Sequence, residues 1–190
     1  MKKYILQVFI LFLFQSVYSQ EYLPDIQTGT RLEYLFDLHG QKRTISLAIK
    51  MQAGSLITEW NLSGVKGTYV ILPEALEQGN QLSVKQLVPF QPDTLKPDET
   101  FCLISRSAFQ DLLKKNRFVY NHTTYVLDTA GTGQDRELEV PGKTLDVLHV
   151  KAQIDATEMW ILNDPDFPVI CRMIKNPLGI NFSLTSVSGE

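Results

Sequence analysis

The chain contains three histidines, the residue type best suited to metal binding and to proton transfer near neutral pH. They are His39, His122 and His149, and no two of them lie at the spacing typical of a zinc site. Asp164 and Asp166 could bind calcium, but they flank prolines and the other ligands of an EF-hand loop are absent from the sequence. We therefore predict solvated or singly hydrogen-bonded histidines, turn-forming aspartates, no metal site and no cofactor.

Residues that could act as nucleophiles occur without the neighbours that nucleophilic catalysis requires. Ser63 and Lys66 match a Ser-x-x-Lys string, but that chemistry needs both side chains on a rigid helix, and Gly64 and Gly67 predict a turn. The sequence has no Gly-x-Ser-x-Gly nucleophile elbow. We predict no catalytic residues and a protein that is not an enzyme; a hydrolase with an unrecognised site is an alternative.

Cys102 and Cys171 are the only cysteines, and both lie among apolar residues of strand-like runs. A catalytic thiolate needs an exposed, electropositive setting, so these surroundings favour inert side chains. Two interpretations are open. In an oxidising compartment the two thiols could form a disulfide, or each could be a small buried hydrophobic residue.

The first 20 residues have the pattern of a secretory signal peptide. Two lysines near the start are followed by an apolar core over Tyr4–Phe14, and the small Ser19 precedes a cleavage point before Gln20. This apolar core is shorter than the about 20 residues that span a bilayer. We predict a cleaved signal peptide over residues 1–19, a single β-rich domain over residues 20–190, and a periplasmic or secreted protein that is not transmembrane.

The charge balance argues against nucleic acid as a partner. Two of the 18 basic residues lie in the predicted signal peptide, which leaves 16 basic against 21 acidic residues, a net charge of −5. A surface of this sign does not attract nucleic acid or anionic lipid.

Apolar and polar residues alternate at a period of two along much of the chain, as is typical of half-buried strands. Residues 31–38, 44–51 and 56–62 form three such runs, and Leu82–Phe90 is a weaker candidate. Pro141 and Gly142 predict a hairpin turn. The clearest meander is C-terminal, with runs over 158–162 and 169–175 and a third that begins at Ile180. These patterns predict about ten antiparallel strands.

One convincing helix interrupts the predicted strands. Ser105 is a natural N-cap, and Asn116 can end the helix. Its length makes it marginal alone, so its apolar stripe must pack against a sheet. The members of the stripe are Ala108, Phe109, Leu112 and Leu113. Pro73–Gln78 could form a further short helical turn with proline in its first position.

Five positions match acceptor strings for glycosylation. Asn61, Asn121 and Asn181 each begin an Asn-x-Ser/Thr sequon, and Asp93 and Asp128 each begin an Asp-Thr-apolar string of a bacterial O-glycosylation type. Both kinds of modification are hypotheses that an intact mass would test.

The chain resembles an uncharacterised group of secreted Bacteroidota proteins related to periplasmic domains of unknown function. The likeness is carried by Trp160 with Leu162, by the turns over 163–168 and 176–179, and by the block Leu95–Phe109. The resemblance implies an open antiparallel barrel that wraps a helix, similar to the fold of periplasmic lipoprotein carriers. Together with the strand pattern, it predicts a mainly β (α+β) fold: a strongly curved open barrel or half-barrel with one short helix on its concave face.

An open sheet of this kind could hold an apolar ligand in a cleft. The candidate lining residues are Phe36, Met51, Trp60, Phe109, Met173 and Phe182. The alternative is that these side chains are simply core. We predict a non-catalytic extracytoplasmic binding protein of the cell envelope whose partner is a hydrophobic small molecule or an envelope protein; the alternative is an envelope scaffold without a small ligand.

Overall fold

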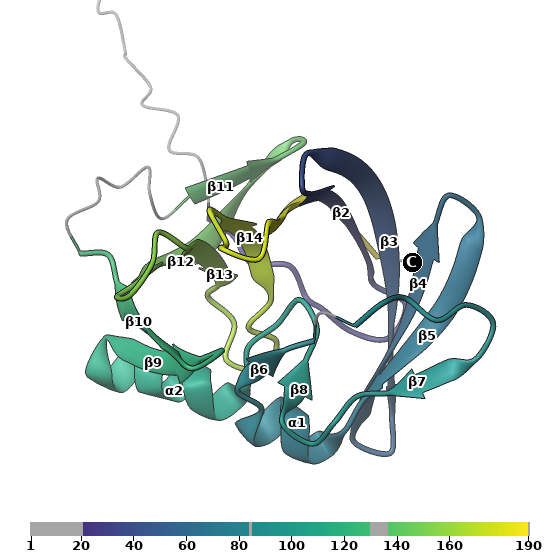
Figure 1. Ribbon diagram of the computed structural model, residues 1–190, viewed down its shortest axis with the longest axis horizontal. Coiled ribbons are helices and arrows are strands. Elements are labelled where there is room, and N and C mark those ends of the chain that lie inside the picture. Colours follow the sequence, from purple (N-terminus) through teal and green to yellow (C-terminus); the bar gives the residue numbers. More distant parts are fainter. Residues whose placement is uncertain (1–20, 84, 130–136, 190) are drawn as a thin grey trace, which may run out of the picture.

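The computed structural model describes residues 21–83, 85–129 and 137–189 (Figure 1). The predicted signal peptide over residues 1–19 therefore lies outside the described residues. Strands make up most of the described chain and helices a small part, which confirms a mainly β protein.

Fifteen strands and two helices follow one another along the described chain. The strands are β1 (Glu21–Tyr22), β2 (Arg31–Leu38), β3 (Gln41–Gln52), β4 (Ser55–Leu62), β5 (Val65–Ile71), β6 (Gln81–Leu82), β7 (Pro92–Thr94), β8 (Glu99–Thr100), β9 (Arg117–Tyr120), β10 (Thr123–Leu127), β11 (Glu137–Val140), β12 (Lys143–Ala152), β13 (Glu158–Leu162), β14 (Ile170–Ile174) and β15 (Ile180–Ser188). The helices are α1 (Pro73–Gln78) and α2 (Arg106–Lys115).

Thirteen of the strands form one large mixed sheet (Figure 1). Its order is β7-β5-β4-β3-β2-β15-β14-β13-β12-β10-β9, and β1 and β11 also pair with β12. The last strand, β15, lies between β2 and β14 and so joins the first strands of the chain to the last ones. In the described chain β7 and β9 do not pair with each other, and the sheet is not closed as a barrel.

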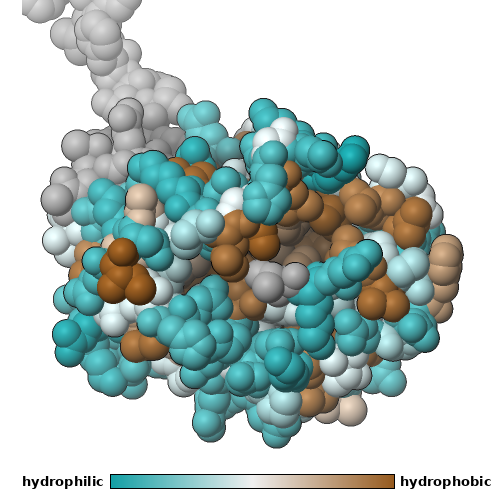
Figure 2. Space-filling model, viewed as in Figure 1, coloured by the Kyte–Doolittle hydropathy of each residue, from teal (hydrophilic) through white to brown (hydrophobic). Residues whose placement is uncertain are grey.

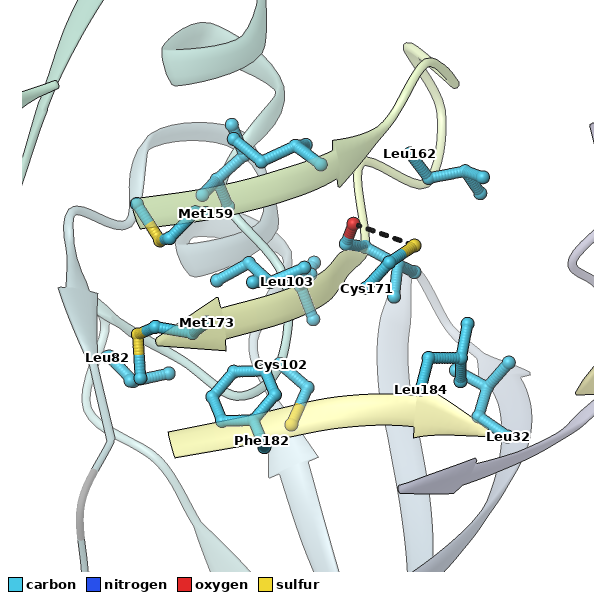
Figure 3. Packing of buried hydrophobic residues seen from close by; sticks show 14 of the residues in the cluster. Leu32, Leu82, Cys102, Leu103, Met159, Leu162, Cys171, Met173, Phe182 and Leu184 are labelled. Atoms are coloured by element: carbon cyan, nitrogen blue, oxygen red, sulfur yellow. Dashed lines mark hydrogen bonds between the residues drawn. The ribbon is translucent and has the colours of Figure 1, made fainter. Parts of the chain in front are cut away.

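The inward face of the sheet follows directly from the alternation in the sequence. On β2 the side chains of Leu32, Tyr34 and Phe36 are buried, while those between them are only half-buried. The register places Ile45 of β3 opposite Tyr34 on one side and opposite Leu62 of β4 on the other. Rows of apolar side chains therefore run across the strands and form one core, part of which is drawn in Figure 3.

Helix α2 begins and ends where the sequence predicts. The Ala108 amide donates to the Ser105 hydroxyl oxygen at 3.4 Å, and Asn116 ends the helix in the left-handed region at φ 55°. Phe109 and Leu112 are fully buried, but Leu113 is 49% exposed. The prediction that Leu113 packs with the rest of the apolar stripe is therefore wrong. The four residues of the stripe span a wider arc of the helix than the side of α2 that is buried.

The fold prediction counted one helix, but the further helical turn predicted over Pro73–Gln78 is present as a second helix, α1. Pro73 occupies its first turn, where the missing amide hydrogen costs no hydrogen bond. Ala75 and Leu76 are buried, and Glu77 lies 3.7 Å from Arg106 at the start of α2. Figure 1 shows the two helices next to each other along one side of the molecule. Packing stabilises a helix that is too short to be recognised from its periodicity.

Two details of the predicted sheet are also wrong. Among the described residues of the predicted run Leu82–Phe90, only Leu82 belongs to a strand, the two-residue β6. The sheet is mixed, since β5 with β7 and β1 with β12 are parallel, and β6 with β8 forms a separate parallel pair. These pairs involve strands of two or three residues, which carry no readable alternation, so about ten strands were predicted where fifteen occur.

Candidate functional site

A cavity of about 470 Å³ opens at one end of the central strands. Its walls come from β2, β3, β4 and β15 and from the segments that follow β6 and β8. The lining residues are Phe36, Leu38, His39, Ile45, Leu62, Leu82, Ser83, Lys85, Gln86, Leu87, Phe101, Cys102, Ile180 and Phe182. Figure 2 shows a hollow near the centre of this face with hydrophobic side chains on its walls. The volume lies within the range of about 300–1,000 Å³ that is usual for ligand pockets.

The strand register explains why apolar side chains meet there. Phe36 of β2 lies opposite Phe182 of β15, and Leu38 opposite Ile180. Because both pairs lie on the inward face at the end of their strands, they form the rim of the core rather than its centre. The cavity thus lies where the ends of β2 and β15 extend beyond the side chains that bury the rest of the inward face.

Three aromatic rings in the cavity wall pack against one another or against a neighbouring ring. The Phe36 ring centroid lies 5.1 Å from that of Phe182 and 6.3 Å from that of Phe101, with the Phe36 and Phe101 rings nearly parallel. Phe101 also contacts Tyr69 edge-on at 5.0 Å. Each ring is thus held by another ring, and such contacts restrict the side chains that would otherwise close the space.

Polar groups at the cavity are few and mostly engaged with other residues. Lys85 lies 3.5 Å from a Glu99 carboxylate oxygen and 3.9 Å from one of Asp93. His39, at the mouth, is packed over Gly179, where a Cβ atom would lie 2.4 Å from the imidazole Nδ1. Ser83 differs from these residues, because its Oγ is buried and has no hydrogen-bond partner among the described residues.

The two cysteines are free thiols in the structure, and both are buried. Cys102 lies at the cavity wall, and the Cys171 thiol donates to the Val169 carbonyl oxygen at 3.7 Å (Figure 3). Burial raises the pKa of the Cys102 thiol far above its ordinary range and that of Cys171 to about 12. Both are therefore protonated at neutral pH and unsuited to nucleophilic attack.

The predicted cleft residues are divided between the cavity and the core. Phe36 and Phe182 line the cavity. Phe109 and Met173 are buried in the core, and Met51 is half-buried at the far end of β3. Met51 and Met173 belong to the sheet and Phe109 to α2, and none of the three lines the cavity, which occupies one end of the inward face.

Trp60 lies in the core beside a second, smaller depression of about 300 Å³. Its indole covers Gly67, where a Cβ atom would lie 2.3 Å from the ring carbon Cζ2. A glycine is needed at position 67 for this close approach. Trp60 is therefore positioned by β5 and does not reach the larger cavity.

The prediction missed most of the cavity wall. Ile45 and Leu62 lie in the predicted strand runs 44–51 and 56–62, and Phe101 lies in the block Leu95–Phe109, but the sequence connected none of them with a site. The segment after β6, with Ser83 and Lys85, was predicted as strand. This segment carries no clear periodic signal, so only the tertiary structure places Ser83 and Lys85 at the cavity.

A second group of polar residues lies at β12 and β13, away from the cavity. The His149 Nε2 lies 3.0 Å from a Glu158 carboxylate oxygen, and Nδ1 lies 3.5 Å from one of Asp128. The imidazole stacks on Trp160, with ring centroids 4.2 Å apart, and Arg172 contacts the same indole. His149 is only 3% exposed, so it is not solvated; its ring makes one hydrogen bond, with Glu158, which agrees with the prediction of a singly bonded histidine.

Glu158 is the centre of this polar group. Burial alone would raise the pKa of its carboxyl, but hydrogen bonds from Lys175 and His149 outweigh burial and lower the pKa. The Lys151 Nζ lies 2.6 Å from a carboxylate oxygen of Asp128. The opposite charges therefore compensate one another within the group, as a structural network requires.

The three sequon asparagines take part in local structure. The side-chain oxygens of Asn61, Asn121 and Asn181 accept hydrogen bonds from the amides of Gly64, Leu82 and Asn176. All three sites remain hypotheses of modification, as do the Asp-Thr strings at Asp93 and Asp128.

Across residues 21–83, 85–129 and 137–189, no three His, Cys, Asp or Glu side chains are grouped so that they could hold a metal ion. Among those same residues, no helix combines the length and apolar character that crossing a membrane requires. Comparison of the chain with protein-family models, with curated proteins and with solved structures returns no match.

Proposed function

We propose that this chain is a non-catalytic binding protein of the cell envelope that holds a hydrophobic small molecule in the cavity at the ends of β2, β3, β4 and β15. The observation that carries the proposal is the cavity itself: about 470 Å³ of space with predominantly apolar walls and three aromatic rings. Apolar walls that face water are unfavourable, and a hydrophobic ligand would remove them from it. A hydrophobic ligand would supply the missing contacts.

The architecture supports the same proposal. The sheet path ends at β7 and β9 without closing, and it is continuous between them. We propose that it acts as a strongly curved, open half-barrel of the kind seen in carriers of apolar molecules, with α1 and α2 closing one side. The open end would then be the entrance for the ligand.

The location outside the cytoplasm is part of the proposal and rests on the sequence of residues 1–19. A signal peptide would deliver the chain to the periplasm or the exterior, where free hydrophobic molecules need a carrier or a receptor. The resemblance to secreted Bacteroidota domains points to the same compartment.

An envelope scaffold is the second candidate, because two apolar side chains are exposed at sheet edges. Phe90, next to β7, is 86% exposed, and Val119 on β9 is 58% exposed. Both edges could accept a strand from a partner protein. A hydrolase is disfavoured, since the histidine with carboxylate neighbours, His149, is buried and does not line the cavity.

Binding of an uncharged hydrophobic dye such as Nile red to the purified protein tests the function. We expect Leu62→Trp, which places an indole into the cavity from the end of β4, to weaken dye binding at least about tenfold, equivalent to about 1.4 kcal/mol. Leu113→Trp on the exposed side of α2 is the matched control and should bind the dye like the wild type. Equal binding by all three proteins, or no binding by the wild type, would contradict the proposal.

A further inference from the structure

We propose that the smaller depression beside Trp60 is a second binding site, on the outward face of the sheet, and that its ligand is a carbohydrate. The inference goes beyond the proposed function and does not rest on it, because the depression and the apolar cavity have no lining residue in common. The position of the depression, its polar groups and an exposed aromatic ring support the assignment.

The strand alternation places the depression on the outward face. Leu47 and Trp60 are buried in the core, so the residues next to them in their strands point outward. The register joins such outward residues into two rows that both line the depression. The first row is Arg31, Ala48, Glu59, Thr68 and Pro92, from β2 to β7, and the second is Ser46, Asn61 and Lys66, from β3 to β5.

Short side chains in the middle of the rows make this part of the face hollow. Strand β3 contributes only Ser46 and Ala48, and in the first row Ala48 lies between the longer Arg31 and Glu59. The short side chains therefore form the floor and the long ones the walls. The resulting space of about 300 Å³ is at the lower end of the usual range for ligand pockets and suits one unit of a longer polar chain.

The charged groups of the depression are exposed and have no counter-charge within the described chain. Arg31, Glu59 and Lys66 form no ion pair with another described residue. Unlike Lys85, which is held by two carboxylates, these side chains are available to a ligand.

These groups supply both donors and acceptors. Arg31 and Lys66 can only donate hydrogen bonds, the Glu59 carboxylate can only accept them, and the Gln91 amide does both. A sugar carries several hydroxyls on neighbouring carbons, and each of them donates and accepts. A neutral polyol can thus use every polar group, whereas an ion would use one kind and meet its own charge in the other.

Phe90 gives the depression an apolar surface that the chain itself does not cover. Its side chain is 86% exposed and lines the depression, and its backbone lies in the left-handed region at φ 68°, where bulky residues are rare. The Phe90 amide donates to the Lys66 carbonyl oxygen at 2.9 Å, and Pro92 pairs with Thr68. The ring is therefore presented from a segment that is fixed to β5 on both sides.

An exposed ring beside polar groups matches the two kinds of surface of a sugar. The face of an aromatic ring carries negative charge, so the polarised C–H groups on one face of a sugar ring can pack on it. The hydroxyls at the edge of the sugar then reach the polar groups of the two rows. Unfavourable backbone conformations persist mainly where function requires them, which fits the conformation of Phe90.

The test titrates the purified protein with neutral hexasaccharides of glucose, mannose, galactose and N-acetylglucosamine and follows the backbone amides by NMR. Each sugar is used at up to about 10 mM, which detects a Kd of several millimolar. We expect at least one sugar to shift the amide signals of Ala48, Glu59 and Thr68 and to leave that of Phe182, in the apolar cavity, unchanged.

Hexaglutamate and hexalysine are titrated in the same way. Absence of a shift at the two rows with all four sugars would overturn the inference. So would shifts of these signals by one of the charged peptides and by none of the sugars, because the ligand would then be recognised by its charge.

The role of Phe90 is tested with Phe90→Ala, which removes no core packing because the side chain is exposed. We expect the sugar to bind at least about tenfold more weakly to Phe90→Ala, and Phe90→Tyr, which keeps the ring, to bind it like the wild type. Val119→Ala, at an exposed apolar residue on the opposite sheet edge, is the matched control and should also bind like the wild type. Unchanged affinity in Phe90→Ala would overturn the stacking contact.

The acceptor role of Glu59 is tested with Glu59→Gln. We expect the sugar to bind roughly three- to tenfold more weakly, because a charge-assisted hydrogen bond becomes a neutral one. Tighter or unchanged binding would contradict recognition by both donors and acceptors.

The same variants separate this inference from the proposed function. Nile red should bind to Phe90→Ala and Glu59→Gln as it binds to the wild type, because neither residue lines the apolar cavity. If the dye binds and no sugar does, the proposed function stands and the carbohydrate site fails. Loss of both ligands in Phe90→Ala would overturn the assignment of two separate sites.

Discussion

At the scale of single residues, the His149 network shows how a polar group can be buried beside an apolar sheet. Glu158 accepts from both Lys175 and His149, and Trp160 covers one face of the imidazole. Each buried charge is thus met by an opposite charge or a hydrogen bond. Removing one member would leave its partners buried and unpaired, which costs more than the pair itself contributes.

The lowered pKa of Glu158 gives this network a defined pH dependence. A carboxyl whose pKa is lower in the folded chain contributes stability above its ordinary pKa of about 4.3, and this contribution is lost as pH falls through the folded value. We expect Glu158→Gln to lower the midpoint of thermal unfolding at pH 7 and to differ less from the wild type near pH 3. Thermal unfolding monitored by circular dichroism from pH 3 to 7 measures this.

Glu59→Gln serves as the control, because Glu59 is exposed on β4. It should follow the wild type across the whole range. A constant difference between Glu158→Gln and the wild type at every pH would show that the ionised carboxylate is not what stabilises the network.

At the scale of elements, α2 depends on its cap and on its covered side. A helix of 10 residues is marginal alone, and Phe109 and Leu112 bury the side chains that hold it in place. Ser105 begins the helix by accepting from the Ala108 amide, at a distance longer than the usual hydrogen bond. The packing therefore contributes more than the cap, although the cap sets where the helix begins.

We expect Ser105→Ala to lower the free energy of unfolding by about 0.5–1 kcal/mol, the lower part of the range for a lost N-cap, because the hydrogen bond is long. Urea unfolding followed by tryptophan fluorescence measures the change. Gln110→Ala, at an exposed position further along α2, should be neutral or slightly stabilising because alanine has the higher helix propensity. A larger loss in Gln110→Ala than in Ser105→Ala would contradict the capping role.

At the scale of the whole molecule, β15 is the strand on which the sheet depends. It is the last strand in the chain but lies in the middle of the sheet, with β2 on one side and β14 on the other. It also supplies Phe182 and Ile180 to the cavity wall. The two halves of the sheet are therefore joined only when β15 pairs with β2, a strand that is distant from it in sequence.

This placement predicts a sharp difference between two truncations. A chain that ends at Gly179 lacks β15, so we expect it to lose cooperative unfolding and Nile red binding. A chain that ends at Val187 keeps nearly all of the pairing with β2 and should unfold like the full chain. Urea titration of both proteins measures the difference, and cooperative unfolding of the shorter chain would show that the two halves fold independently.

Local rules in the sequence determined the long strands, the C-terminal meander and α2. The alternation of Leu32, Tyr34 and Phe36, the cap at Ser105 and the turn at Gly142 act through neighbouring residues, so their consequences can be read along the chain. The shortest strands could not be predicted, because two or three residues carry too little periodic pattern, and α1 was signalled only by the proline of its first turn. The tertiary contacts that stabilise them lie far away in sequence.

The candidate site could likewise be predicted from the sequence only in part. Phe36 and Phe182 were recognised as inward-facing aromatic residues, since a period of two defines which face a strand residue occupies. That an end of this face stays open, that the buried Ser83 hydroxyl has no hydrogen-bond partner among the described residues, and that Lys85 is already paired were decided only by the tertiary structure. Each of these facts depends on which distant segments meet, and a strand pattern specifies a face but neither its neighbours nor the space between them.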